Sequence, residues 1–157
     1  MIDLTRRIGQ LLVQNQWRIG TAESCTGGLL AAAITEVAGS SAWFDEGVVT
    51  YANASKQRLL GVQKSVLEEF GAVSQQVVEA MVEGVFVNGA DVALATSGIA
   101  GPDGGTADKP VGTVWMAWGV DGQIESEMRC FEGDRQAVRL AASEYLFGCL
   151  LEKLERF

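Results

Sequence analysis

Histidine is absent from the 157 residues of this chain. Its absence removes the side chain that most often acts as a general base and most often binds transition metals. The three cysteines, Cys25, Cys130 and Cys149, are far apart and show no Cys-x-x-Cys spacing. We therefore expect neither a metal site nor a disulfide framework. Unpaired cysteines also favour a reducing, cytoplasmic location.

Basic residues and long apolar runs are also scarce. Lysine and arginine number 12 against 20 aspartates and glutamates, which gives a formal net charge of −8. This balance argues against nucleic acid as a partner, because affinity for a phosphate backbone comes from clustered basic residues. The longest apolar run, residues 29–34, is far shorter than the roughly 18 residues that cross a membrane. Small molecules or other proteins are the expected partners.

The hydrophobic pattern alternates between helical and strand periods along the chain. Helices are expected over residues 3–16, 29–37, 53–60, 66–70, 74–85 and 134–154, and strands over residues 18–22, 47–51, 91–96, 113–120 and 124–131. Early alternation followed by a late hairpin predicts a three-layer α/β/α sandwich with a mixed sheet. The length suits one domain, residues 1–157.

Two hydroxyls and a thiol follow the first predicted strand. Ser24, Cys25 and Thr26 precede Gly27 and Gly28 at the start of a predicted helix. Free N–H groups and the positive dipole end of a helix suit an oxyanion or a phosphate, and the glycines let a ligand approach the backbone. The same residues could instead serve only to cap the helix and pack it on the sheet.

Lys56, one of only four lysines, follows the second predicted strand. It falls in the first turn of a helix, where the dipole disfavours a cation, so its proton is lost more easily. Burial or a nearby arginine would lower its pKa further. In a chain without histidine, a serine activated by a lysine is a natural amidohydrolase design. A solvated surface lysine is the alternative.

A glycine-rich loop and an arginine pair complete the candidate residues. The loop, residues 97–112, holds both prolines and could form a ligand wall with the Ser97 hydroxyl, or could be purely structural. Arg135 and Arg139 lie four residues apart at a helix start that Asp134 caps. They could grip a phosphate together, and surface ion pairing is equally consistent with that spacing.

The chain resembles the CinA C-terminal-domain family over nearly its whole length. The matching segments are residues 21–28, 39–44, 49–51 with Lys56, 71–74, 97–105 and 109–114. Stand-alone members of that family include nicotinamide mononucleotide amidohydrolases. The resemblance implies an α/β/α domain that converts this nucleotide to nicotinic acid mononucleotide and ammonia, without metal or cofactor, in pyridine nucleotide recycling.

The resemblance also implies roles for individual residues. Ser24 matches the nucleophile and Lys56 the general base, while Tyr51 would position Lys56 or the substrate. Thr26 and neighbouring backbone N–H groups would hold the oxyanion. Cys25 is a rival nucleophile, because a thiol at a helix start can have a depressed pKa. Substrate contacts are expected from Gly27, Gly28, Ser97, Gly98, Arg135 and Arg139.

Two further questions stay open at this stage. The chain could be a catalytically silent nucleotide-binding or interaction module of the same family, which would be stabilised by the nucleotide without forming product. A homodimer is also possible, because the last predicted helix carries several apolar residues: Leu146, Phe147, Leu150, Leu151 and Leu154. The same residues could all belong to the core.

Overall fold

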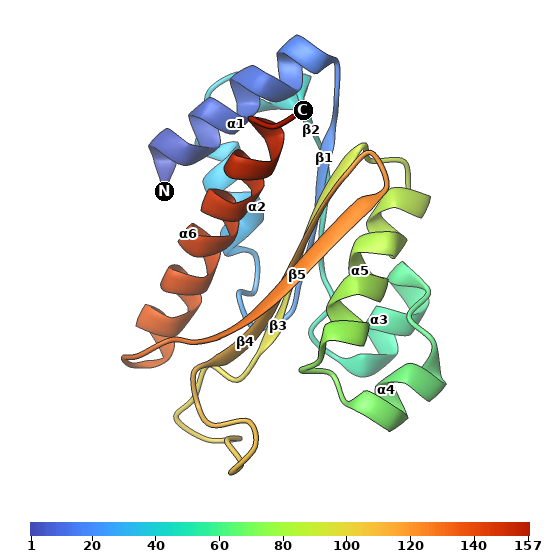
Figure 1. The fold of residues 1–157 in the computed structure, drawn as a ribbon, viewed down its shortest axis with the longest axis vertical. Helices are drawn as coiled ribbons and strands as arrows, with labels where there is room; N and C mark the ends of the chain where they lie inside the picture. Colours follow the sequence, from blue (N-terminus) through green and yellow to red (C-terminus); the bar gives the residue numbers. More distant parts are fainter.

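The computed structural model describes residues 1–157 and contains one five-stranded sheet with helices on both faces (Figure 1). The strand order is β2-β1-β3-β4-β5. Three strands are parallel and two form an antiparallel hairpin, so the predicted mixed sheet is confirmed. The strands are β1 (Ile19–Glu23), β2 (Phe44–Val49), β3 (Val92–Gly98), β4 (Thr113–Val120) and β5 (Gln123–Cys130).

The helices form the two outer layers of the predicted α/β/α sandwich (Figure 1). One face is covered by α1 (Ile2–Asn15), α2 (Leu29–Thr35) and α6 (Arg135–Leu154), and the other by α3 (Asn53–Leu60), α4 (Lys64–Phe70) and α5 (Gln75–Val87). A short 3₁₀ helix, Ser40–Ala42, precedes β2. None of the helices is both long enough and apolar enough to cross a membrane.

A separate hydrophobic cluster fills each face of the sheet. Strand β3 serves both, because Val92 and Leu94 pack beneath α1, α2 and α6 while Ala93 and Ala95 pack beneath α5. This central strand is buried on both sides, as its continuous apolar sequence predicts. Four of the five α6 residues considered for an interface lie in the hydrophobic cluster beneath α1, α2 and α6: Leu146, Phe147, Leu150 and Leu154. They therefore give no support to the predicted homodimer.

Strand β2 differs from its predicted range, 47–51, because it begins and ends earlier. Beyond Val49 the chain leaves the sheet, and the carbonyls of Thr50 and Tyr51 turn toward Lys56. Helix α3 follows from Asn53 with Ala52 at its N-cap, and no side chain caps it.

The carboxyl ends of β1, β2 and β3 lie together at one end of the sheet. Glu23 pairs with Val49 on one side and with Thr96 on the other. The strand order reverses here, since the chain passes from β1 to β2 on one side and later returns to β3 on the other. Open α/β sheets bind ligands at such a point. The residues after these strands, Ser24 and Thr50, and the end of β3 are therefore brought together.

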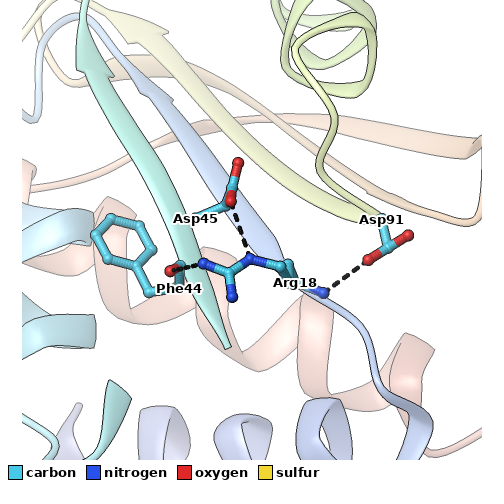
Figure 2. Close-up of polar contacts among 4 residues, drawn as sticks. All are labelled: Arg18, Phe44, Asp45 and Asp91. Carbon is cyan, nitrogen blue, oxygen red and sulfur yellow. Dashed lines mark hydrogen bonds and ion pairs between the residues drawn. The ribbon is translucent and has the colours of Figure 1, made fainter. Parts of the chain in front are cut away.

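Arg18 ties the opposite ends of the same three strands together (Figure 2). Its guanidinium donates to Asp45 Oδ1 at 2.9 Å and to the Phe44 carbonyl at 2.8 Å, at the start of β2. Its backbone N–H donates to Asp91 Oδ2 at 2.8 Å, just before β3. Arg18 therefore links the amino-terminal ends of the three strands, at the end of the sheet opposite Ser24.

Substitution Arg18→Met should lower the free energy of unfolding by about 1 kcal/mol, because two charge-assisted hydrogen bonds at the surface are lost. For a chain of this size that corresponds to a fall of roughly 2–4 °C in Tm. Thermal unfolding followed by circular dichroism measures the change. An unchanged Tm would show that these contacts do not hold the strands.

Candidate active site

Ser24 and Lys56 lie side by side where β1 ends and α3 begins. Lys56 Nζ is 3.1 Å from Ser24 Oγ, 2.7 Å from the Thr50 carbonyl oxygen and 3.3 Å from that of Tyr51. The side chain of Lys56 has no exposed surface. The alternative of a solvated surface lysine is therefore wrong, because α3 directs this side chain inward, beneath the end of β2.

Burial lowers the pKa of Lys56 below its ordinary value of 10.5. No carboxylate forms an ion pair with its ammonium group, whose only polar partners are two backbone carbonyls and the Ser24 hydroxyl. Burial alone accounts for the lowered pKa of Lys56, and no arginine contributes to it. The arrangement thus places beside a serine hydroxyl an amine that loses its proton more readily than an ordinary lysine.

The nearest carboxylate, Glu23, is directed at helix α2 instead. Its two oxygens accept hydrogen bonds from the backbone N–H groups of Gly28, Leu30 and Ala31 at 3.0–3.1 Å. Thr26 Oγ1 donates to the same carboxylate at 2.6 Å. The helix N-terminus predicted to receive an oxyanion or phosphate is therefore filled by Glu23. No capping motif reveals this, because the carboxylate comes from the preceding strand.

Two backbone amides beside Ser24 are nevertheless free. The N–H groups of Cys25 and Thr26 donate no hydrogen bond within the chain. The amides expected to contact substrate are engaged, since Gly27 N–H donates to the Ser24 carbonyl at 3.0 Å and Gly28 N–H donates to Glu23. The available donors of this turn thus precede the two glycines.

The side chains of Thr26 and Cys25 are both turned into the protein. The Thr26 hydroxyl is buried between Glu23 and Thr96, whose Oγ1 lies 2.8 Å away. Of the polar groups of Thr26, only the backbone N–H lacks a partner within the chain. Burial raises the pKa of the Cys25 thiol to about 11, so it stays protonated at neutral pH. This argues against Cys25 as the nucleophile.

The backbone carbonyl of Tyr51 contacts Lys56, whereas its ring faces solvent. The residue is 61% exposed. Its hydroxyl accepts a hydrogen bond from Arg135 Nη2 at 3.0 Å. Arg135 Nη1 donates at 2.7 Å to the Gly101 carbonyl in the glycine-rich loop. Arg135 thus joins the start of α6 to Tyr51 and to the glycine-rich loop.

Arg139 reaches the Ser24 turn from one helical turn further along α6. Its Nε donates to the Cys25 carbonyl and its Nη2 to the Thr26 carbonyl, both at 3.0 Å. Together with Leu29 and Arg135 it also lines a hollow of about 420 Å³. A larger cavity of about 570 Å³ lies between α3, α4 and α5 and contains none of the predicted site residues.

Ser97 and Gly98 end strand β3 next to the Ser24 turn. Ser97 follows the alternation of Ala93 and Ala95, so it faces the α3 side, where Lys56 lies. Its hydroxyl makes no hydrogen bond within the chain, although the residue is only 1% exposed. At Gly98 an added Cβ would come within 2.7 Å of the Thr113 carbonyl oxygen. Pairing with β4 therefore accounts for this glycine.

These features define a class of protein: an α/β/α fold with a candidate serine–lysine hydrolase site at its topological switch point. The sequence profile of the CinA C-terminal domain matches residues 1–154. The chain belongs to this family. Whole-chain structures agree: that of the competence damage-inducible protein A from Klebsiella pneumoniae has 43% identity and a TM-score of 0.95, covering 99% of this chain and 98% of that one.

Two relatives have a named activity. A protein of Enterobacter agglomerans named nicotinamide-nucleotide amidohydrolase PncC is 57% identical over 145 residues, 91% of this chain and 88% of that protein. The protein of the same name from Escherichia coli K12 is 46% identical over 155 residues, 98% and 94% of the two chains. The likeness therefore extends over nearly all of each protein.

Substitution Lys56→Met should raise stability most at neutral and lower pH. Because the folded-state pKa lies below 10.5, both states carry the charge at low pH and burial of that charge fully opposes folding. The penalty declines as pH rises through the folded-state pKa toward 10.5. The difference in Tm between variant and parent, measured by calorimetry from pH 6 to 10.5, should therefore shrink, at about 2–4 °C per kcal/mol. A constant difference would contradict the lowered pKa.

Proposed function

We propose that this chain hydrolyses the carboxamide of nicotinamide mononucleotide to nicotinic acid mononucleotide and ammonia. The observation that carries the proposal is the buried Lys56 amine 3.1 Å from Ser24 Oγ, next to two free backbone amides. The named activity of the relatives supports the same substrate class. The products suit a role in pyridine nucleotide recycling.

The contacts of Lys56 suit a general base. A neutral amine has two N–H bonds and one lone pair. The carbonyls of Thr50 and Tyr51 can accept both N–H bonds, which leaves the lone pair for the Ser24 hydroxyl. The two carbonyls would therefore orient the base as well as bind it.

In the proposed first half-reaction, Ser24 Oγ attacks the carboxamide carbon and its proton passes to Lys56. The carbonyl oxygen becomes an oxyanion, which the N–H groups of Cys25 and Thr26 stabilise. The C–N bond then breaks, and Lys56 returns the proton to the departing nitrogen, which leaves as ammonia. An ester between Ser24 and the nicotinic acid group remains.

Water completes the proposed cycle. Lys56, neutral again, takes a proton from the water that attacks the ester carbon. The same two amides hold the second oxyanion. When the ester bond breaks, the proton returns to Ser24 Oγ and nicotinic acid mononucleotide is released. The protein supplies every proton acceptor and donor that these steps require.

The substrate's remaining groups match the walls of the site. The pyridinium ring is cationic, and the exposed ring of Tyr51 offers an aromatic face at the entrance. Ser97 has a free hydroxyl for the carboxamide or the ribose. Arg135 contacts the hydroxyl of Tyr51, and we assign the phosphate to its guanidinium. A cytoplasmic location is proposed from the three free cysteines, and a homodimer remains a prediction.

Ammonia release from nicotinamide mononucleotide by the purified chain tests the function. Ser24→Ala should reduce kcat by about 10⁴-fold or more, because the covalent route is lost, while Cys25→Ala should keep the greater part of the activity. The two variants differ by one position in the same turn. Production of the acid nucleotide, followed by chromatography, measures both.

The opposite pattern would assign the nucleophile to Cys25. Stabilisation of the unsubstituted chain by the nucleotide, without any product, would reject the enzyme in favour of a silent binding module. Ser24→Ala, which keeps the pocket, should still bind the nucleotide and so serves as the positive control for folding.

The rate should rise with pH. Only the neutral form of Lys56 accepts the serine proton, and burial lowers its pKa below 10.5. The profile of kcat/KM should therefore show one ascending limb whose midpoint lies below 10.5. Steady-state rates between pH 5 and 10 measure it. A rate independent of pH throughout that range would argue against Lys56 as the titrating base.

A further inference from the structure

Arg139 binds the turn that carries Ser24, on the side opposite the free amides of that turn. The guanidinium forms no ion pair with any carboxylate, and its hydrogen bonds go to two consecutive carbonyls, those of Cys25 and Thr26. The position of Arg139 is fixed by helix α6. That helix begins after Asp134, whose side chain caps it by accepting a hydrogen bond from Ala137 N–H. This is a fixed cation aimed at backbone oxygens.

The geometry of the peptide unit links the hydrogen bonds of Arg139 to the direction of the free amides. In a trans peptide unit the carbonyl and the N–H point in opposite directions. The Cys25 carbonyl and the Thr26 N–H belong to one unit, so Arg139 on the oxygen directs the N–H away from α6. The cation also polarises the unit, which strengthens its N–H as a donor. The neighbouring unit is held in the same manner, since the Ser24 carbonyl accepts from Gly27 N–H.

We infer that Arg139 is a positioning residue that fixes the oxyanion-binding amide of Thr26, rather than a residue that holds the substrate's phosphate. The inference deepens the proposed function and rests on it. The guanidinium also leaves little room for a side chain at the turn: Gly27 has a φ of +60°, and a Cβ there would come within 3.2 Å of Arg139 Nη2.

Kinetics with two substrates separate the two roles. Arg139→Met should lower kcat about 100-fold, with KM changed less than about threefold, for nicotinamide mononucleotide and for the phosphate-free nicotinamide riboside alike. A phosphate role predicts instead a raised KM for the mononucleotide and no effect on the riboside, which would overturn the inference. Arg6→Met, which removes the same charge from the surface of α1, is the matched control.

Rescue and backbone order distinguish positioning from a general loss of folding. Millimolar guanidinium should restore at least tenfold of the kcat lost in Arg139→Ala, because the free cation can bind the same carbonyls. In ¹⁵N relaxation, the amides of Cys25, Thr26 and Gly27 should have order parameters near 0.85 in the parent and below about 0.6 in Arg139→Met. Unchanged order parameters would overturn the inference.

The relaxation measurement does not depend on the reaction. If the unsubstituted chain releases no ammonia, the proposed function fails while the order parameters still report whether Arg139 holds the turn. If the chain is active and Arg139→Met retains kcat, the proposed function stands and the inference is overturned.

Discussion

The Glu23 carboxylate at the start of α2 is the interaction on which the site depends. It binds three backbone N–H groups of that helix and the Thr26 hydroxyl, so it holds both ends of the turn that carries Ser24. A buried carboxylate is tolerable only with such partners. With its charge directed into α2, Glu23 leaves Lys56 without an ion pair, so burial lowers the pKa of the lysine with no carboxylate to oppose it.

The site thereby separates two buried charges that would otherwise cancel. A carboxylate and a lysine on neighbouring segments would normally form an ion pair, which would raise the pKa of the lysine and remove its use as a base. Here the helix dipole and backbone amides stabilise the anion, and two backbone carbonyls receive the amine. The guanidinium of Arg139 is likewise directed to carbonyls. Backbone groups therefore determine the electrostatics of the site.

Periodicity predicted the helices, the hairpin and the three layers, because these depend on hydrophobic patterns over many residues. It also placed Ser24 and Lys56 after successive strands, and the parallel pairing of those strands in the structure brings the two side chains together. The sequence could not show that Glu23 fills the helix N-terminus, because that contact joins a strand to a helix without a local motif. Nor could spacing separate a phosphate contact from a carbonyl contact for Arg139. The end of β2 was misplaced because Thr50 and Tyr51 favour strands, while their carbonyls bind Lys56 instead.

Strand β2 lies at the edge of the sheet and pairs only with β1. The two residues that follow its carboxyl end supply the carbonyls that contact Lys56, whereas Ser24 follows β1, which has a neighbour on each side. Edge segments open locally at a lower free energy than central strands do. The proposed base, Lys56, is thus held by the less stable of the two strands, and fraying of β2 would separate it from Ser24 while the core stayed folded. Inactivation by heat would then precede loss of the fold, so that catalytic competence reports on the sheet margin and not on global stability.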